Sequence, residues 1–173
     1  GETILAESVL ASVTPSQLYD RLLDDPQIKE RRNVDAFRHG RGNFQLHYAL
    51  DRPPQWRTAG LDDVALIHLA DGIDSVSKSA NEAERGMLPQ TPTICVGQPH
   101  RLDATRCPEG KAILWLQIPD APRVIKGDAA GQIATTGAWT EETRELYADR
   151  IEAILRHHIQ DFDAIKLARR AYS

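Results

Sequence analysis

The chain of 173 residues lacks the features that mark several large classes of protein. Its two cysteines, Cys95 and Cys107, are too few for a disulfide framework or a zinc-binding motif. No apolar run approaches the roughly 20 residues that span a bilayer, and no charged segment with an apolar core forms a signal peptide. We therefore expect a cytoplasmic protein whose thiols are both free.

Positive charge is also scarce. The 21 Lys and Arg residues stand against 25 Asp and Glu residues, which gives a formal net charge of −4. The most basic stretch, residues 29–41, is interrupted by Glu30 and Asp35. Because non-specific nucleic-acid binding needs a clustered basic surface, we expect no nucleic acid among the partners.

Catalytic and cofactor-binding motifs are missing as well. The sequence has neither a Gly-x-Ser-x-Gly elbow nor the Gly-x-Gly-x-x-Gly spacing of a dinucleotide-binding loop. None of the six histidines has metal-ligand spacing, and the adjacent His157 and His158 would point about 100° apart on a helix. We predict no catalytic, cofactor-binding or metal-binding residue in this chain. A small hydrolase that uses Cys95 or a histidine remains a formal alternative.

The strongest pattern that is present is a strict alternation over residues 43–50. It indicates a strand with one buried face, because successive side chains of a strand point to opposite sides of the sheet. The apolar set is Phe44, Leu46, Tyr48 and Leu50, and the opposite set is Asn43, Gln45, His47 and Ala49. The opposite set has no charge, so this face either lines a pocket or simply meets solvent.

Five further segments are predicted to be extended. They are residues 4–13, 64–70, 93–98, 111–118 and 162–172. Both faces of residues 64–70 are apolar, which predicts a strand at the centre of the sheet. In the last segment we expect Ile165, Leu167 and Ala171 to point inward.

Four helices are predicted between these segments. The first helix runs from Pro15 to about Asp24, and the second from Asp25 and Pro26 to about Phe37. The third ends at about Arg85, and the fourth covers residues 141–158. Thr14 and Gln17 form a capping box at the start of the first helix. Asp71 or Asp74 begins the third helix, and Thr140 begins the fourth.

Together these elements predict an α+β fold, with a mainly antiparallel or mixed β-sheet and helices packed on one face. The other face would form the wall of a pocket. Its candidate residues are Gln45, His47, Trp115 and Gln117, with Gln98 and His100 in the nearby loop. An apolar wall with a few hydrogen-bonding groups is a common way to build a small-molecule pocket. Plain packing or solvent exposure is the alternative for each residue.

Seven segments resemble the phytoene desaturase-like FAD-dependent oxidoreductases. They are ILAESVLASVTP at residues 4–15, GRGNFQLHYAL at 40–50, NEAERG at 81–86, PTICVGQP at 92–99, PEGK at 108–111, LWLQ at 114–117 and IKGD at 125–128. The resemblance covers nearly the whole chain, although its motifs are structural. It implies that the chain is the central substrate-binding domain of a larger flavoprotein.

The resemblance also implies partners and cofactors. The parent protein would be an oxidoreductase that carries FAD on a domain absent from this chain, so we expect no FAD on the chain alone and no turnover. Residues 1–173 would form one substrate-binding domain, with residues 1–14 as a boundary segment toward the FAD domain. The substrate would be small and apolar or amphipathic. Nothing in the sequence indicates that the parent associates with a membrane surface.

Two further expectations concern assembly. If the chain is a domain cut from its partner, exposed apolar surface favours a homodimer, with residues 4–13 as an edge strand. The alternative to the oxidoreductase interpretation is a self-standing, non-enzymatic module that binds an apolar small molecule or a partner protein.

Overall fold

The structure is a computed structural model that describes residues 2–23 and 31–173. It divides into two compact units, Gly1–Gly40 and Arg41–Ser173. Residues 1–14, the expected boundary segment, belong to the first unit. All the candidate pocket residues belong to the second unit.

The first unit contains a well-formed helix start. α1 (Pro15–Gln17) continues into η1 (Leu18–Leu22), a π-helix, and α2 (Arg31–Ala36) follows. The predicted capping box is confirmed, because the Thr14 hydroxyl accepts from the backbone N–H of Gln17 and the Gln17 side chain accepts from that of Thr14.

Other predictions for the first unit have different outcomes. Residues 4–13 form no strand, so the prediction of a β segment there is wrong. The described residues of this unit include no second strand for it to pair with, and a single strand is not stable alone. Its apolar side chains are exposed instead, to 80% at Ile4 and 100% at Leu10. Asp24, Asp25 and Pro26 lie outside the described residues.

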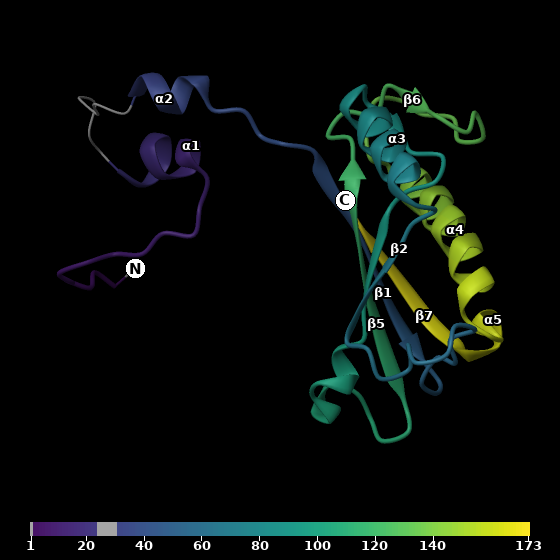
Figure 1. Cartoon of the computed structure of the whole chain (residues 1–173). Helices are drawn as coiled ribbons and strands as arrows, with labels where there is room; N and C mark the ends of the chain where they lie inside the picture. Colours follow the sequence, from purple (N-terminus) through teal and green to yellow (C-terminus); the bar gives the residue numbers. More distant parts are fainter. Residues whose placement is uncertain (1, 24–30) are drawn as a thin grey trace. The chain divides into compact units, whose positions relative to one another are not determined.

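The second unit is built around one sheet (Figure 1). Its strands are β1 (Gly42–Leu50), β2 (Leu66–Leu69), β3 (Met87–Leu88), β4 (Ile94–Gly97), β5 (Ala112–Ala121), β6 (Gly127–Asp128) and β7 (Lys166–Tyr172). Its helices are α3 (Ile73–Glu84), α4 (Glu141–His158) and α5 (Phe162–Ile165), with the short 3-10 turns η2 (Pro99–Arg101) and η3 (Ala104–Arg106).

Five of these strands form one antiparallel sheet in the order β2-β4-β5-β1-β7, and β3 pairs with β6 in parallel. The predicted α+β class with a mainly antiparallel sheet is therefore confirmed. The predicted central position of residues 64–70 is wrong, because β2 is an edge strand and its Leu66 is 51% exposed. Apolar residues on both faces did not distinguish a central strand from a short edge strand.

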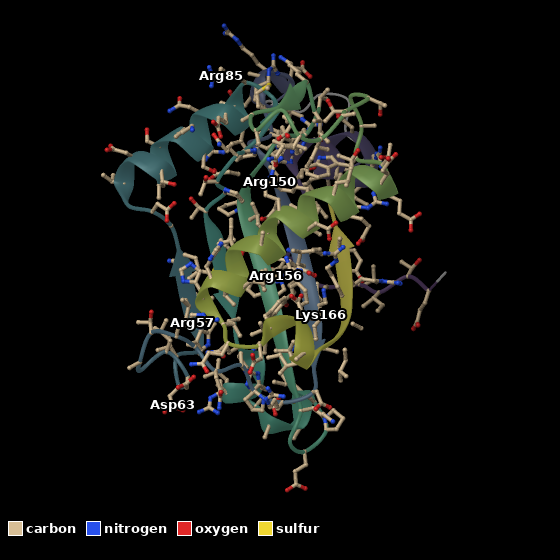
Figure 2. All side chains as sticks on the ribbon, turned by 90° about the vertical axis from the view of Figure 1, so that its right-hand side faces the viewer. Arg57, Asp63, Arg85, Arg150, Arg156 and Lys166 are labelled. Atoms are coloured by element: carbon tan, nitrogen blue, oxygen red, sulfur yellow. The ribbon has the colours of Figure 1, made fainter. Side chains whose placement is uncertain are left out.

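The core lies between the sheet and α4. The apolar set of β1 is buried as predicted and faces the same side as Ala112, Leu114, Leu116 and Ile118 of β5. α4 begins after Thr140, whose hydroxyl accepts from the Thr143 N–H, and it covers the predicted residues 141–158. Figure 2 looks onto this face, with α4 lying across the strands.

Two further details differ from the sequence-based expectation. α3 begins after Gly72, with no side-chain cap, so neither Asp71 nor Asp74 caps it. Gly72 has φ of 91°, a conformation that favours glycine. Leu167 is 60% exposed rather than inward, because the pairing of β7 with β1 is irregular at this position. Ile165 is buried and Ala171 packs against the core, as predicted.

Candidate functional site

The face of the sheet opposite α4 carries its side chains in rows that cross the strands. One row runs Gly97, Trp115, His47 and Arg170, from β4 through β5 and β1 to β7. The next row contains Ile113, Ala49 and Ala168. Neighbouring strands lie about 4.8 Å apart, so adjacent side chains of a row are close enough to contact one small ligand together.

A hollow of about 750 Å³ lies over these two rows. We call it the sheet hollow. The side chains on this face that line it are His47, Ala49, Ile113, Trp115, Ala168 and Arg170, with Pro99 and Arg106 from the η2 and η3 segment. Ala49 and Ala168 are the smallest of these, and they lie opposite each other on β1 and β7, beside the larger Ile113 and His47. The depth of the hollow therefore comes from two adjacent alanines.

Trp115 is held in place on two sides. Its Nε1 donates to Oε1 of Gln45 at 3.5 Å, and its ring lies over Gly97. A Cβ built on Gly97 would be 3.0 Å from Cε3 of the indole, so this close packing depends on a glycine. On the other side of the row, the rings of His47 and Tyr172 meet edge to face at 5.5 Å.

The structure brings four of the six candidate residues to this face. His47 and Trp115 line the sheet hollow, while Gln45 and Gln117 lie opposite each other in the adjacent row. Gln45 contributes indirectly through its hydrogen bond to Trp115.

The remaining two candidates lie elsewhere. Gln98 is buried, and its amide is fully engaged: Oε1 accepts from Trp56 Nε1, and Nε2 donates to the carbonyls of Leu61 and Val64. It ties a loop to the end of β4 and does not reach the sheet hollow. His100 Nδ1 lies 3.1 Å from the carbonyl oxygen of Ile113, and its Nε2 is buried without a partner.

The thiol proposed for the hydrolase alternative is poorly placed for catalysis. Cys95 lies on the same face and opposite His68 of β2. No hydrogen bond joins its sulfur to an imidazole within the described part of the chain, and burial raises the pKa of the thiol. A nucleophilic cysteine needs the opposite shift, because the thiolate is the reactive form.

The sequence analysis missed the contributions of β7 and of the η2 and η3 segment. Ala168 and Arg170 lie in a stretch without clear alternation, and Arg106 lies in a short turn. Only the pairing of β7 beside β1 brings Ala168 and Arg170 next to Ala49 and His47. No local sequence signal marks that pairing.

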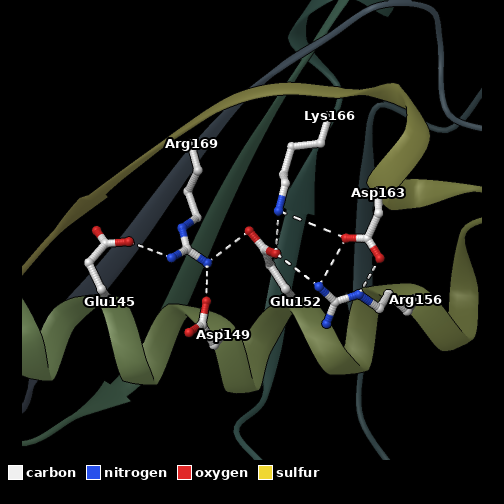
Figure 3. A network of polar contacts seen from close by, with 7 residues as sticks. All are labelled: Glu145, Asp149, Glu152, Arg156, Asp163, Lys166 and Arg169. Atoms are coloured by element: carbon white, nitrogen blue, oxygen red, sulfur yellow. Dashed lines mark hydrogen bonds and ion pairs between the residues drawn. The ribbon is translucent and has the colours of Figure 1, made fainter.

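Strand β7 is fastened to α4 by a network of ion pairs (Figure 3). Glu152 is buried on α4 and accepts from Lys166 Nζ at 2.6 Å and from Arg169 Nη1 at 2.8 Å. Arg169 also donates to Asp149 and Glu145. These contacts lie on the core side of β7 and hold the strand against α4. The opposite side of the same strand carries Ala168 and Arg170, which line the sheet hollow.

No group of three or more His, Cys, Asp or Glu side chains within residues 2–23 and 31–173 is arranged to hold a metal ion. In the same residues, no helix is both long enough and apolar enough to cross a bilayer. Comparison with known proteins gives no match to any protein-family model and no match among curated proteins.

Proposed function

We propose that Arg41–Ser173 is the substrate-binding domain of an FAD-dependent oxidoreductase of the phytoene desaturase-like type, and that the sheet hollow takes a small apolar or amphipathic molecule. The observation that supports this best is the sheet hollow itself. Its volume of about 750 Å³ is within the range of about 300–1,000 Å³ that is usual for small-molecule sites.

The two faces of the sheet have different environments, and this difference supports the proposal. One face is committed to the core and to the α4 contacts, whereas the other presents Trp115, Ile113 and two alanines to the sheet hollow. Exposed apolar side chains gathered in a hollow are unfavourable in water unless something covers them. A ligand with an apolar body would cover them.

The chain's own residues do not make a flavin site of the usual kind. No Gly-x-Gly-x-x-Gly spacing occurs in the sequence, and β6, which contains Gly127, is followed by a loop that runs to Thr140 before α4 begins. We therefore derive no flavin step from these residues. In the proposal, FAD belongs to another part of the parent protein.

A second candidate function shares the same hollow. A self-standing module could bind the same class of ligand without catalysis. The coding sequence before Gly1 separates the two: a glycine-rich dinucleotide-binding loop upstream supports the oxidoreductase, and an initiator codon directly before Gly1 contradicts it. A stoichiometric flavin spectrum on the purified chain would contradict a different part of the proposal, the placing of FAD outside this chain, since FAD would then be bound here.

The binding itself is tested with N-phenyl-1-naphthylamine, a neutral dye that fluoresces in apolar surroundings. We expect saturable binding that Ala168→Phe abolishes, because the larger side chain fills the hollow without removing a core contact. Ala134→Phe, in an exposed loop, is the matched control and should bind normally. Equal binding by both variants would overturn the assignment of the sheet hollow as the ligand site.

A further inference from the structure

We infer that the ligand of the sheet hollow carries an anionic group, held by Arg170 and Arg106 while its apolar body lies against Trp115 and Ile113. This inference rests on the proposed function and specifies the substrate class. The preferred ligand is then a small aromatic or aliphatic acid, that is, a molecule with a carboxylate, sulfonate or phosphate at one end.

The charges around the sheet hollow are of one sign. Arg106, Arg169 and Arg170 are among the residues that line it, and no acidic residue is. The chain as a whole has a formal net charge of −4, so this local excess runs against the overall balance. A hollow with fixed positive charge attracts anionic ligands and repels cationic ones.

Arg170 is free to bind a ligand. Its neighbour Arg169 points to the other side of β7, where Glu145, Asp149 and Glu152 bind its guanidinium. By contrast, Arg170 forms no ion pair or hydrogen bond with any side chain that the structure describes. A guanidinium has five N–H donors in a planar fork that matches a carboxylate or phosphate.

The position of Arg170 also suits this role. It is directly opposite His47, and His47 is directly opposite Trp115, so a cation and an indole lie two strands apart in one row. At a strand spacing of about 4.8 Å, these two side chains start roughly 10 Å apart. A ligand with an aromatic ring on Trp115 and an acid group on Arg170 would span that row.

The apolar part of the ligand has its own surface. The second row, which consists of Ile113, Ala49 and Ala168, lines the sheet hollow together with Pro99 and offers no charged group. Trp115 presents a large planar surface at low conformational cost, because its Nε1 is already bound by Gln45. The sheet hollow therefore offers both apolar surface and positive charge, which is the requirement for recognising an amphipathic acid.

The test compares two dyes that share one skeleton. 8-Anilinonaphthalene-1-sulfonate carries a sulfonate, and N-phenyl-1-naphthylamine is the same molecule without it. We expect the anionic dye to bind about tenfold more tightly at low ionic strength, and the difference to shrink as salt screens the charges.

Substitution of the arginines tests whether they cause the preference for the anionic dye. Arg170→Gln should remove most of the difference between the dyes while leaving the affinity for the neutral dye nearly unchanged. Arg57→Gln is the matched control, since Arg57 is exposed and sits beside the end of α4, where its backbone N–H bonds to the His158 carbonyl. It removes one positive charge and should leave the preference intact.

The outcomes separate this inference from the proposed function. Equal affinity for both dyes, or a preference that survives Arg170→Gln and Arg106→Gln together, overturns the anionic ligand even if Ala168→Phe still blocks binding. If Ala168→Phe leaves the affinity for the neutral dye unchanged, the sheet hollow is not the binding site. Circular dichroism on each variant confirms that the fold is retained.

Discussion

Gly97 and Trp115 lie opposite each other on β4 and β5, and the indole of Trp115 occupies the space that a side chain at position 97 would need. Trp115 lines the sheet hollow, so this close packing fixes where its ring lies there. It also explains why the last residue of β4, an inner strand of the sheet, is a glycine, although glycine normally weakens a strand.

The first prediction concerns this pair. Gly97→Ala should push the Trp115 ring away from the sheet by a few tenths of an ångström, since the added Cβ would be 3.0 Å from Cε3. We expect the tryptophan emission to move to longer wavelength as the ring becomes more exposed. The same substitution in a Trp115→Phe background should leave the emission unchanged, and a shift there would assign the effect to Trp56 or Trp139.

The second prediction concerns the buried phenol of Tyr147. Its ring packs against Phe44 at 5.2 Å, but its hydroxyl is buried with no hydrogen-bond partner. Burial raises the pKa of this phenol, so the group stays protonated and its donor stays unmatched. Tyr147→Phe should raise the free energy of unfolding by about 1 kcal/mol, because it removes an unsatisfied polar group. A loss of stability in urea denaturation would contradict the packing described.

The third prediction concerns the network that fastens β7 to α4. Glu152→Gln should lower the free energy of unfolding by about 3 kcal/mol, since it leaves Lys166 and Arg169 without their buried counter-charge. Hydrogen exchange should speed up first in β7. Asp163→Asn, which removes an exposed partner of Arg156, is the control and should cost less than about 1 kcal/mol.

The fourth prediction concerns pH. Asp128 is buried, which by itself would raise the pKa of its carboxyl, but hydrogen bonds from Arg150 and from the N–H groups of Gln132 and Ile133 hold that pKa below its usual value. A lowered pKa in the folded state stabilises the fold above the unfolded pKa of about 3.9. This contribution is lost as pH falls through the folded value.

The free energy of unfolding of Asp128→Asn should therefore differ from that of the wild type mainly above about pH 4. We expect it to be less stable at pH 7, and we expect the difference to shrink in acid-titrated denaturation curves. Glu109→Gln, which removes a carboxylate from an exposed turn, is the matched control. A difference for Asp128→Asn that stays constant into acid would mean that the charge of Asp128 is not what stabilises this loop.

Much of the fold could be predicted where the pattern was local. The alternation over residues 43–50 and the Thr140 cap each depend on a few consecutive residues, and β1 and α4 formed where those patterns indicated. The edge position of β2 could not be predicted, because strand order depends on contacts between distant segments. The exposed Leu167 likewise follows from the irregular pairing of β7 with Leu50.

The same limit applies to the site. His47 and Trp115 stood out because they alternate with core residues, whereas Ala168 and Arg170 lie on a strand whose core side is charged. Arg169 is directed toward α4, where Glu152, 17 residues earlier in the chain, binds its guanidinium. Gln98 is a residue that the sequence suggested for ligand binding but that has a structural role. Its amide oxygen and nitrogen are already hydrogen-bonded to Trp56, Leu61 and Val64.

The most direct test of the account is a titration of ¹⁵N-labelled protein with 8-anilinonaphthalene-1-sulfonate, followed by the chemical shifts of the backbone amides. We predict that the largest changes fall on His47, Ala49, Ile113, Trp115 and Ala168, all on the side of the sheet opposite α4. Largest changes along α4 or within residues 2–23 would contradict the claim that this face of the sheet is the binding surface.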